Sequence, residues 1–154
     1  ILFSSAFIVL YLAFRFAIGG FANGLKFGIA AIVAMLHDIG VLVGTFCVLG
    51  YLLNWKIDAL FVTAALTVIG FSVHDTIIIF DRIRENLHLR GGKAEFGEIV
   101  SASINETFAR SVFTSGTVVM TLVALIVFGG PVIRPLNAAL LIGILSGTYS
   151  SIFN

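Results

Sequence analysis

The feature that most constrains this chain is a series of long apolar runs, separated by short polar or glycine-rich breaks. Hydrophobic residues occupy 59% of the 154 positions and charged residues only 11%, whereas soluble domains carry about 25% charged residues. A helix needs about 20 mainly apolar residues to cross a bilayer. The composition excludes an ordinary water-soluble domain, and the sequence predicts an all-α polytopic membrane protein.

Five runs are long enough for this purpose, and we expect transmembrane helices at residues 1–17, 26–51, 59–80, 107–128 and 136–153. The breaks contain Gly19-Gly20, Asn54 and Gly129-Gly130-Pro131, residues that mark turns. We treat the five runs as a single transmembrane domain over residues 1–154. Because the chain begins directly in apolar sequence without methionine, we expect it to be part of a longer protein.

The connector at residues 81–106 has a helical pattern of its own. Residues 81–89 are expected to continue the third helix into the cytosol, until Gly91-Gly92 ends it. Beyond it, apolar residues recur at helical spacing with polar residues between them: Phe96, Ile99, Val100 and Ile104. This pattern predicts an amphipathic helix that lies on the inner membrane surface or packs on a cytosolic partner.

The basic residues predict the orientation of the chain. If the five runs alternate in direction, one side of the membrane receives Arg15, Lys26, Arg82, Arg84, Arg90 and Lys93. The other side receives Lys56 and Arg134, and Arg110 lies at the edge of a span. Since cytoplasmic loops carry an excess of Lys and Arg, the Arg82–Lys93 side is predicted to be cytoplasmic. Tyr51 and Trp55 then fall at the outer boundary, where amphipathic rings are favoured.

The strongest candidates for chemistry are Asp75 in the third run and Arg110 in the fourth. An aspartate at the bilayer centre costs roughly 2.5–3.5 kcal/mol on insertion scales, so such residues are usually functional or paired. Both residues are expected within roughly 10 Å of the cytoplasmic face, at 1.5 Å per residue, and an ion pair between them would lower the cost of each. Two interpretations remain open at this point: a proton-conducting pair, or a fixed ion pair that holds two helices together.

Several further residues are secondary candidates for a proton path. His74 precedes Asp75, and His37 with Asp38 forms a second ionisable pair near the middle of the second run. Asp38 is expected either to extend the path or to orient a contact between helices. Hydroxyl stripes at helical spacing include Thr114, Thr117 and Thr121 on the fourth run, and Thr63 and Thr67 on the third. They are expected to line a hydrated path or to hydrogen-bond between helices.

Other polar and small residues are expected to have structural roles. Asp81, Arg82, Arg84 and Glu85 can pair at helical spacing and anchor the third helix at the membrane surface. Glu106 lies four residues before Arg110 and can compete with Asp75 for it. Close helix packing is predicted at Gly40-x-x-x-Gly44 and Gly143-x-x-x-Gly147.

An enzymatic role is not expected. An aspartyl intramembrane protease needs two close carboxyl groups, but Asp38 lies near mid-bilayer and Asp75 nearer the inner face, without a Gly-x-Gly-Asp motif. One cysteine, Cys47, allows no disulfide or zinc framework within the chain, and it is expected to be a small buried apolar residue. No metal or cofactor is predicted. Without a phosphate-binding loop, the energy source must be an ion gradient or a partner.

Motifs throughout the chain resemble the SecF family, the smaller membrane subunits of SecDF protein-export complexes within the RND superfamily. The resemblance rests on Leu36-His37-Asp38, Gly70-Phe-Ser-Val-His-Asp-Thr, Phe80-Asp-Arg-Ile-Arg-Glu-Asn, Ser103-Ile-Asn-Glu-Thr with Arg110, and Leu141-Ile-Gly-Ile-Leu-Ser-Gly-Thr-Tyr-Ser-Ser. One departure is His74, where asparagine is more usual in the family. The five runs would match spans two to six of a six-span subunit, with the first span and an external domain absent from this chain.

The resemblance also implies a function and partners. Such a subunit lies in the bacterial cytoplasmic membrane with SecD and uses the proton-motive force to help the SecYEG channel export proteins. The exported chain would be handled by the external domain, protons would be the coupling ion, and no nucleic acid is involved. The family's proton-conducting aspartate and arginine correspond to Asp75 and Arg110. The alternatives are an RND-type small-molecule efflux half and a non-conducting scaffold subunit.

Overall fold

The computed structural model describes Phe7, residues 21–90 and residues 95–153, and these ranges contain four long helices. They are α2 (Phe21–Leu53), α3 (Ala59–Arg90), α4 (Phe96–Phe128) and α5 (Arg134–Phe153). The span predicted at residues 1–17 lies, apart from Phe7, outside the described residues. The all-α prediction is confirmed for the described part of the chain.

Each of these four helices contains a segment long and apolar enough to cross a membrane. The segments are Gly28–Leu53, Ala59–Leu89, Phe96–Phe128 and Arg134–Phe153. As predicted, α3 continues past residue 80 and reaches Arg90. The prediction of a separate surface helix before the fourth span is wrong, because residues 96–128 form one helix.

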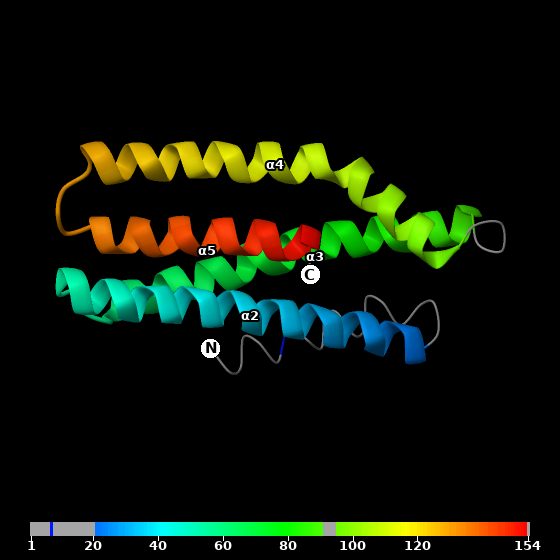
Figure 1. Ribbon diagram of the computed structural model, residues 1–154, viewed down its shortest axis with the longest axis horizontal. Helices are drawn as coiled ribbons and strands as arrows, with labels where there is room; N and C mark the ends of the chain where they lie inside the picture. Colours follow the sequence, from blue (N-terminus) through cyan, green and yellow to red (C-terminus); the bar gives the residue numbers. More distant parts are fainter. Residues whose placement is uncertain (1–6, 8–20, 91–94, 154) are drawn as a thin grey trace.

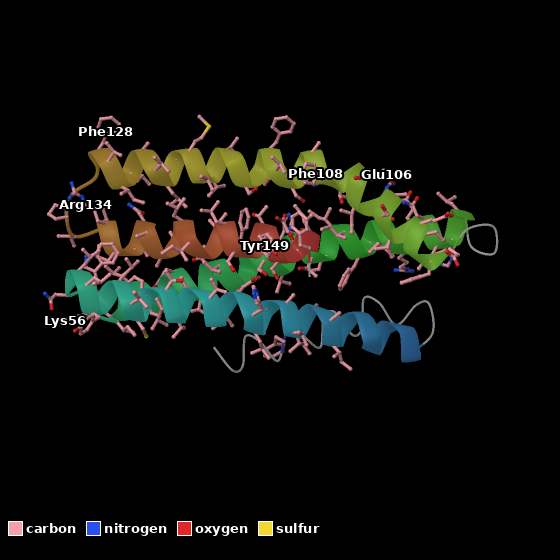
Figure 2. All side chains as sticks on the ribbon, viewed as in Figure 1. Lys56, Glu106, Phe108, Phe128, Arg134 and Tyr149 are labelled. Atoms are coloured by element: carbon pink, nitrogen blue, oxygen red, sulfur yellow. The ribbon has the colours of Figure 1, made fainter. Side chains whose placement is uncertain are left out.

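Helix α5 occupies the centre of the arrangement and packs against α2, α3 and α4. Figure 1 shows it between α4 and the crossing pair α2 and α3. The first turns of α4 slant towards the far end of α3. We call the end that carries Lys56 and Arg134 the Lys56 end (Figure 2). The opposite end, where α3 finishes and α4 starts, is the Arg82 end.

Two glycines allow α5 to approach α3 closely. A Cβ atom added at Gly143 would lie 2.2 Å from Val68 Cγ2, and one at Gly147 would lie 3.3 Å from Ser72 Cβ. Gly40 and Gly44 have no such neighbour within 4 Å. The packing role predicted for the Gly143 motif is therefore confirmed, whereas the Gly40 motif makes no close helix contact in this structure.

The apolar core near the Lys56 end is centred on Phe46 of α2. Its ring lies 4.4 Å from the ring of Phe61 and 5.9 Å from that of Trp55, measured between centroids. Trp55 thus packs inward, while Tyr51 is 88% exposed, as expected of a boundary residue. Cys47 is exposed and not buried as predicted, because it lies beside Phe46 on the outward face of α2.

Local residues define both connections at the Lys56 end. Asn54 adopts a left-handed backbone conformation with φ 56°, which asparagine tolerates better than most residues. Asp58 Oδ1 accepts a hydrogen bond from the Phe61 amide at 3.0 Å and caps α3. At the end of α4, a Cβ on Gly129 would lie 2.1 Å from the Leu125 carbonyl oxygen, so only glycine fits.

The close contact between α3 and α5 predicts a specific effect of Gly143→Ala. Its added methyl group overlaps the stiff, buried side chain of Val68, and overpacking of this kind costs about 1–3 kcal/mol. The thermal unfolding midpoint of the full-length protein in detergent should therefore fall. Gly40→Ala is the matched control and should leave it unchanged, and Val68→Ala should restore stability to Gly143→Ala. Equal effects of the two glycine substitutions would contradict this account of the packing.

Candidate functional site

Asp75 is a buried carboxyl group in the middle of an apolar helix. Its residue is 2% exposed, and its Oδ2 has no hydrogen-bond partner. Its neighbour His74 points outward and is exposed. A buried polar atom without a partner costs about 1–3 kcal/mol, so this position needs a functional or structural explanation.

Arg110 does not form the expected ion pair with Asp75 in this structure. Its side chain is exposed, and no salt bridge joins these two described residues. The two charges are nevertheless close enough to interact electrostatically. Asp75 and Arg110 are thus neighbours without direct contact.

The register between α3 and α4 explains this separation. Arg82 pairs with Glu106, and Asn86 pairs with Ser103, so the two helices run antiparallel with these residues opposite each other. Arg110 follows Glu106 by one helical turn, so it lies at the level of Ile78 on α3. Arg110 is therefore displaced along the axis from Asp75 by about one helical turn, or roughly 5 Å, towards the Arg82 end.

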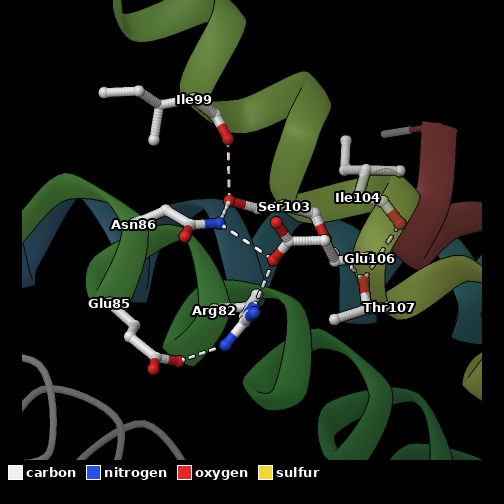
Figure 3. A network of polar contacts seen from close by, with 8 residues as sticks. All are labelled: Arg82, Glu85, Asn86, Ile99, Ser103, Ile104, Glu106 and Thr107. Carbon is white, nitrogen blue, oxygen red and sulfur yellow. Dashed lines mark hydrogen bonds and ion pairs between the residues drawn. The ribbon is translucent and has the colours of Figure 1, made fainter. Parts of the chain in front are cut away.

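Charged groups at the Arg82 end connect α3 to α4 (Figure 3). Arg82 Nε donates to Glu106 Oε2 at 2.5 Å, and Arg82 Nη1 donates to Glu85 Oε2 at 2.6 Å. The i, i+3 pair of Arg82 and Glu85 is one of the ion pairs expected among residues 81–85. Arg84 is half-buried and Asp81 is exposed. The anchor differs from expectation in reaching a second helix through Glu106.

Beneath these charges, a buried amide joins the same two helices. Asn86 is 2% exposed, and its Nδ2 donates to Ser103 Oγ at 2.9 Å and to Glu106 Oε2 at 3.2 Å. Ser103 in turn donates to the Ile99 carbonyl at 2.7 Å. The first turns of α4, which were expected on the membrane surface, are therefore held against α3 by buried polar contacts (Figure 3).

Asp38 is the second buried carboxyl group, and it differs from Asp75 by having partners on two other helices. It is 1% exposed. Ser72 of α3 donates to its Oδ2 at 2.5 Å, and Ser146 of α5 donates to its Oδ1 at 3.3 Å. The half-exposed His37 places Nδ1 3.2 Å from the same Oδ1. Asp38 thus joins α2, α3 and α5 in one hydrogen-bonded group.

The threonine stripes of α3 and α4 lie on exposed helix faces in this structure. The side chains of Thr114, Thr117 and Thr121 are exposed on α4, as are those of Thr63 and Thr67 on α3. Each hydroxyl donates to a carbonyl three or four residues earlier in its own helix. These hydroxyls are satisfied within their helices, as polar groups in hydrocarbon require.

The buried polar residues of α4 are mainly serines that the sequence pattern did not single out. On α4 they are Ser103, Thr107, Ser111 and Ser115, whose four-residue spacing places them on one helical face. Ser111 Oγ and Ser150 Oγ have no hydrogen-bond partner, as is true of Asp75 Oδ2. The four-residue repeat was the available signal. The threonines at 114, 117 and 121 form a similar repeat on the adjacent face, and the sequence alone favoured that face.

The buried amide at the Arg82 end predicts that Asn86→Ala loosens the start of α4. The substitution leaves the buried Ser103 with one partner fewer, at a cost of about 1–3 kcal/mol. Amide hydrogen exchange at residues 96–106 should accelerate by about fivefold or more, because local opening becomes easier. Glu85→Gln, at an exposed position, is the control and should change exchange little. Unchanged exchange in Asn86→Ala would show that other contacts hold this segment.

The chain resembles known proteins along its whole length. The family model for the protein export membrane protein SecD/SecF, C-terminal, matches residues 1–154. The protein translocase subunit SecF of Thermobaculum terrenum is 58% identical over 144 residues, which cover 94% of this chain and 44% of that protein. The SecF subunit of Sebaldella termitidis is 41% identical, covering 97% of this chain and 45% of that protein.

Solved structures agree with the sequence comparisons. A crystal structure of SecDF in its super-membrane-facing form has a TM-score of 0.82 and 38% identity, covering 97% of this chain and 19% of that one. The crystal structure of SecDF from Thermus thermophilus, a translocon-associated membrane protein, has a TM-score of 0.80 and 39% identity. The match covers 94% of this chain and 18% of that one. The chain thus spans less than half the length of these SecF relatives. By these matches, it belongs to the SecD/SecF C-terminal family of protein export membrane proteins.

Proposed function

We propose that this chain is the transmembrane part of a SecF-type subunit that works with SecD and uses the proton-motive force to assist protein export. The family membership and the SecF names of its relatives support the export role. The structures similar to it are SecDF proteins, which supports SecD as the partner. The SecYEG channel and the exported chain would be reached through parts of the protein beyond this domain.

The observation that carries the proton-driven mechanism is the environment of Asp75. This carboxyl group is buried in a helix long enough to span a membrane, and one of its oxygens is unpaired. Charged groups at such a depth usually pair or mark an ion pathway. A carboxyl group that gains and loses a proton satisfies this requirement, because it is neutral when unpaired and charged when paired.

The mechanism has two states, one in which Asp75 is uncharged and separate from Arg110 and one in which Asp75 is charged and paired with it. The arrangement described here suits an uncharged Asp75, since an ionised carboxylate at this depth needs a close partner. When Asp75 loses its proton, its negative charge attracts Arg110, and α4 moves against α3 by up to one turn. A charge that crosses the membrane releases roughly 2.3 kcal/mol per 100 mV, enough to bias such a shift.

The orientation follows from the basic residues. The Arg82 end would face the cytoplasm of the bacterial inner membrane, and the Lys56 end would face outward. This assignment is supported by the cluster of Arg82, Arg84 and Arg90 at one end against Lys56 and Arg134 at the other. Protons would then enter at the Lys56 end and leave at the Arg82 end.

The mechanism predicts that Asp75→Asn abolishes proton-driven export without preventing assembly, because the amide keeps the shape and cannot ionise. Export of a secreted protein into inverted membrane vesicles should lose its proton-dependent component, a fall of about tenfold or more. Co-purification with SecD should persist. Asp58→Asn is the matched control and should export normally, since asparagine also caps helices. Normal proton-dependent export by Asp75→Asn would refute the mechanism.

Arg110 separates the motor from a passive scaffold. In the proposed mechanism, Arg110→Ala assembles with SecD and loses the proton response, while Arg110→Lys keeps part of it because the charge remains. In a scaffold, Arg110→Ala would disrupt assembly itself. Co-purification and vesicle export of the two variants, with Arg134→Ala at the opposite end as the control, distinguish these roles.

A further inference from the structure

The second buried carboxyl group, Asp38 of α2, is hydrogen-bonded to the seam between α3 and α5, one helical turn from the level of Asp75. Val68 faces Gly143, and Ser72 faces Gly147 one turn later, so the two helices run parallel in this register. Continuing the register by three or four residues brings Asp75 to the level of Ser150. Two polar levels are therefore stacked along the seam, one turn apart: Ser72 with Ser146, and Asp75 with Ser150.

The two levels have complementary hydrogen bonding. At the first, both carboxyl oxygens of Asp38 are occupied by Ser72 and Ser146. At the second, Asp75 Oδ2 and Ser150 Oγ are buried and unpaired. Residues three or four apart on a helix lie about 5–6 Å from each other at Cβ, a gap that one water molecule can bridge between Ser72 and Asp75. The relay proposed below places one water there, beside the unpaired Asp75 Oδ2 and Ser150 Oγ.

The first level also includes an exposed imidazole. His37 Nδ1 lies 3.2 Å from Asp38 Oδ1, and the His37 side chain is 40% exposed. Asp38 is displaced from Asp75 towards the Lys56 end, because its partner Ser72 precedes Asp75 on α3. The titratable group that contacts Asp38 among the described residues is His37 on α2, and the titratable residues that follow its partner Ser72 on α3 are His74 and Asp75. Helix α5, which is described from Arg134 to Phe153, offers it only the hydroxyl of Ser146.

We propose that Asp38 is a second proton-binding site, which passes protons to Asp75 along the α3–α5 seam. This inference rests on the proposed function. A protonated Asp38 donates its proton to Ser72 Oγ, while the Ser72 hydroxyl proton passes through the bridging water to the Asp75 carboxylate. Ser72 is unchanged, Asp38 becomes a carboxylate and Asp75 a carboxylic acid. Asp38 then regains a proton from the exposed imidazolium of His37, which takes up another in turn.

The decisive variant is Asp38→Asn. Asparagine still accepts a hydrogen bond from Ser72, so a purely structural Asp38 should tolerate it, whereas a proton carrier cannot. The full-length protein is assembled with SecD in proteoliposomes that enclose a pH-sensitive dye, and the initial rate of proton entry is measured under an imposed pH gradient. We expect Asp38→Asn to slow entry by about tenfold or more, equivalent to a barrier higher by about 1.4 kcal/mol. Asp75→Asn should reduce it to background, and Asp58→Asn should match the original protein.

A spectroscopic measurement separates proton binding from packing. Infrared difference spectra recorded across a pH titration should contain a carboxyl band that disappears in Asp38→Asn and a second band that disappears in Asp75→Asn. If Asp38→Asn slows proton entry but no carboxyl band is lost, Asp38 acts only in packing and the inference fails.

The outcomes also separate this inference from the function it rests on. Proton entry at the original rate in Asp38→Asn, with Asp75→Asn inactive, overturns the role of Asp38 alone. Entry at the original rate in Asp75→Asn overturns both. Should Asp38→Asn fail to assemble, Ser72→Ala decides the question. It keeps both carboxyl groups and removes the relay, so an unchanged rate overturns the inference and a slowed rate supports it.

Discussion

The close approach of α5 to α3 is the contact on which the rest of the arrangement depends. Gly143 and Gly147 remove the side chains that would otherwise separate the two backbones. In hydrocarbon, apolar surfaces gain little from associating, so close packing and interhelical hydrogen bonds must hold helices together. The two glycines allow the close packing, and the same approach of α5 places Ser146 within hydrogen-bond distance of Asp38. Packing and polar chemistry therefore share one seam.

The two buried aspartates illustrate how the same side chain takes different roles in different surroundings. Asp38 has hydroxyl donors from α3 and α5 on both of its oxygens, whereas Asp75, one turn after Ser72 on α3, keeps an unpaired oxygen. Pairs of titratable groups whose environments differ in this way are typical of sites that move protons. In the proposed mechanism the satisfied group receives the proton, and the unsatisfied group converts its charge into a shift of α4.

The sequence predicted the parts of this fold that depend on local chemistry. Apolar runs and turn residues were enough to place α2, α3 and α5, and glycine spacing pointed to the α5 contact but also to Gly40 and Gly44, which make no close contact. Burial was harder to predict, because it depends on which face of a helix meets its neighbours. The threonines at 114 and 117 and the serines at 111 and 115 occupy adjacent faces of α4, and only tertiary packing decides which faces inward. For the same reason, the partners of Asp38 and the displacement of Arg110 became clear only from the helix register.

The unbroken course of α4 has a mechanical consequence. This helix of 33 residues is about 50 Å long at 1.5 Å per residue. It ends at Gly129, where the chain folds back into α5 through a short link. A rotation at this pivot grows along the helix, so a tilt of about 5° would carry the other tip, which Arg82 and Asn86 hold against α3, through roughly 4 Å. A movement too small to disturb the packing beside Gly129 would thus become a displacement of nearly one helical turn at the opposite membrane face.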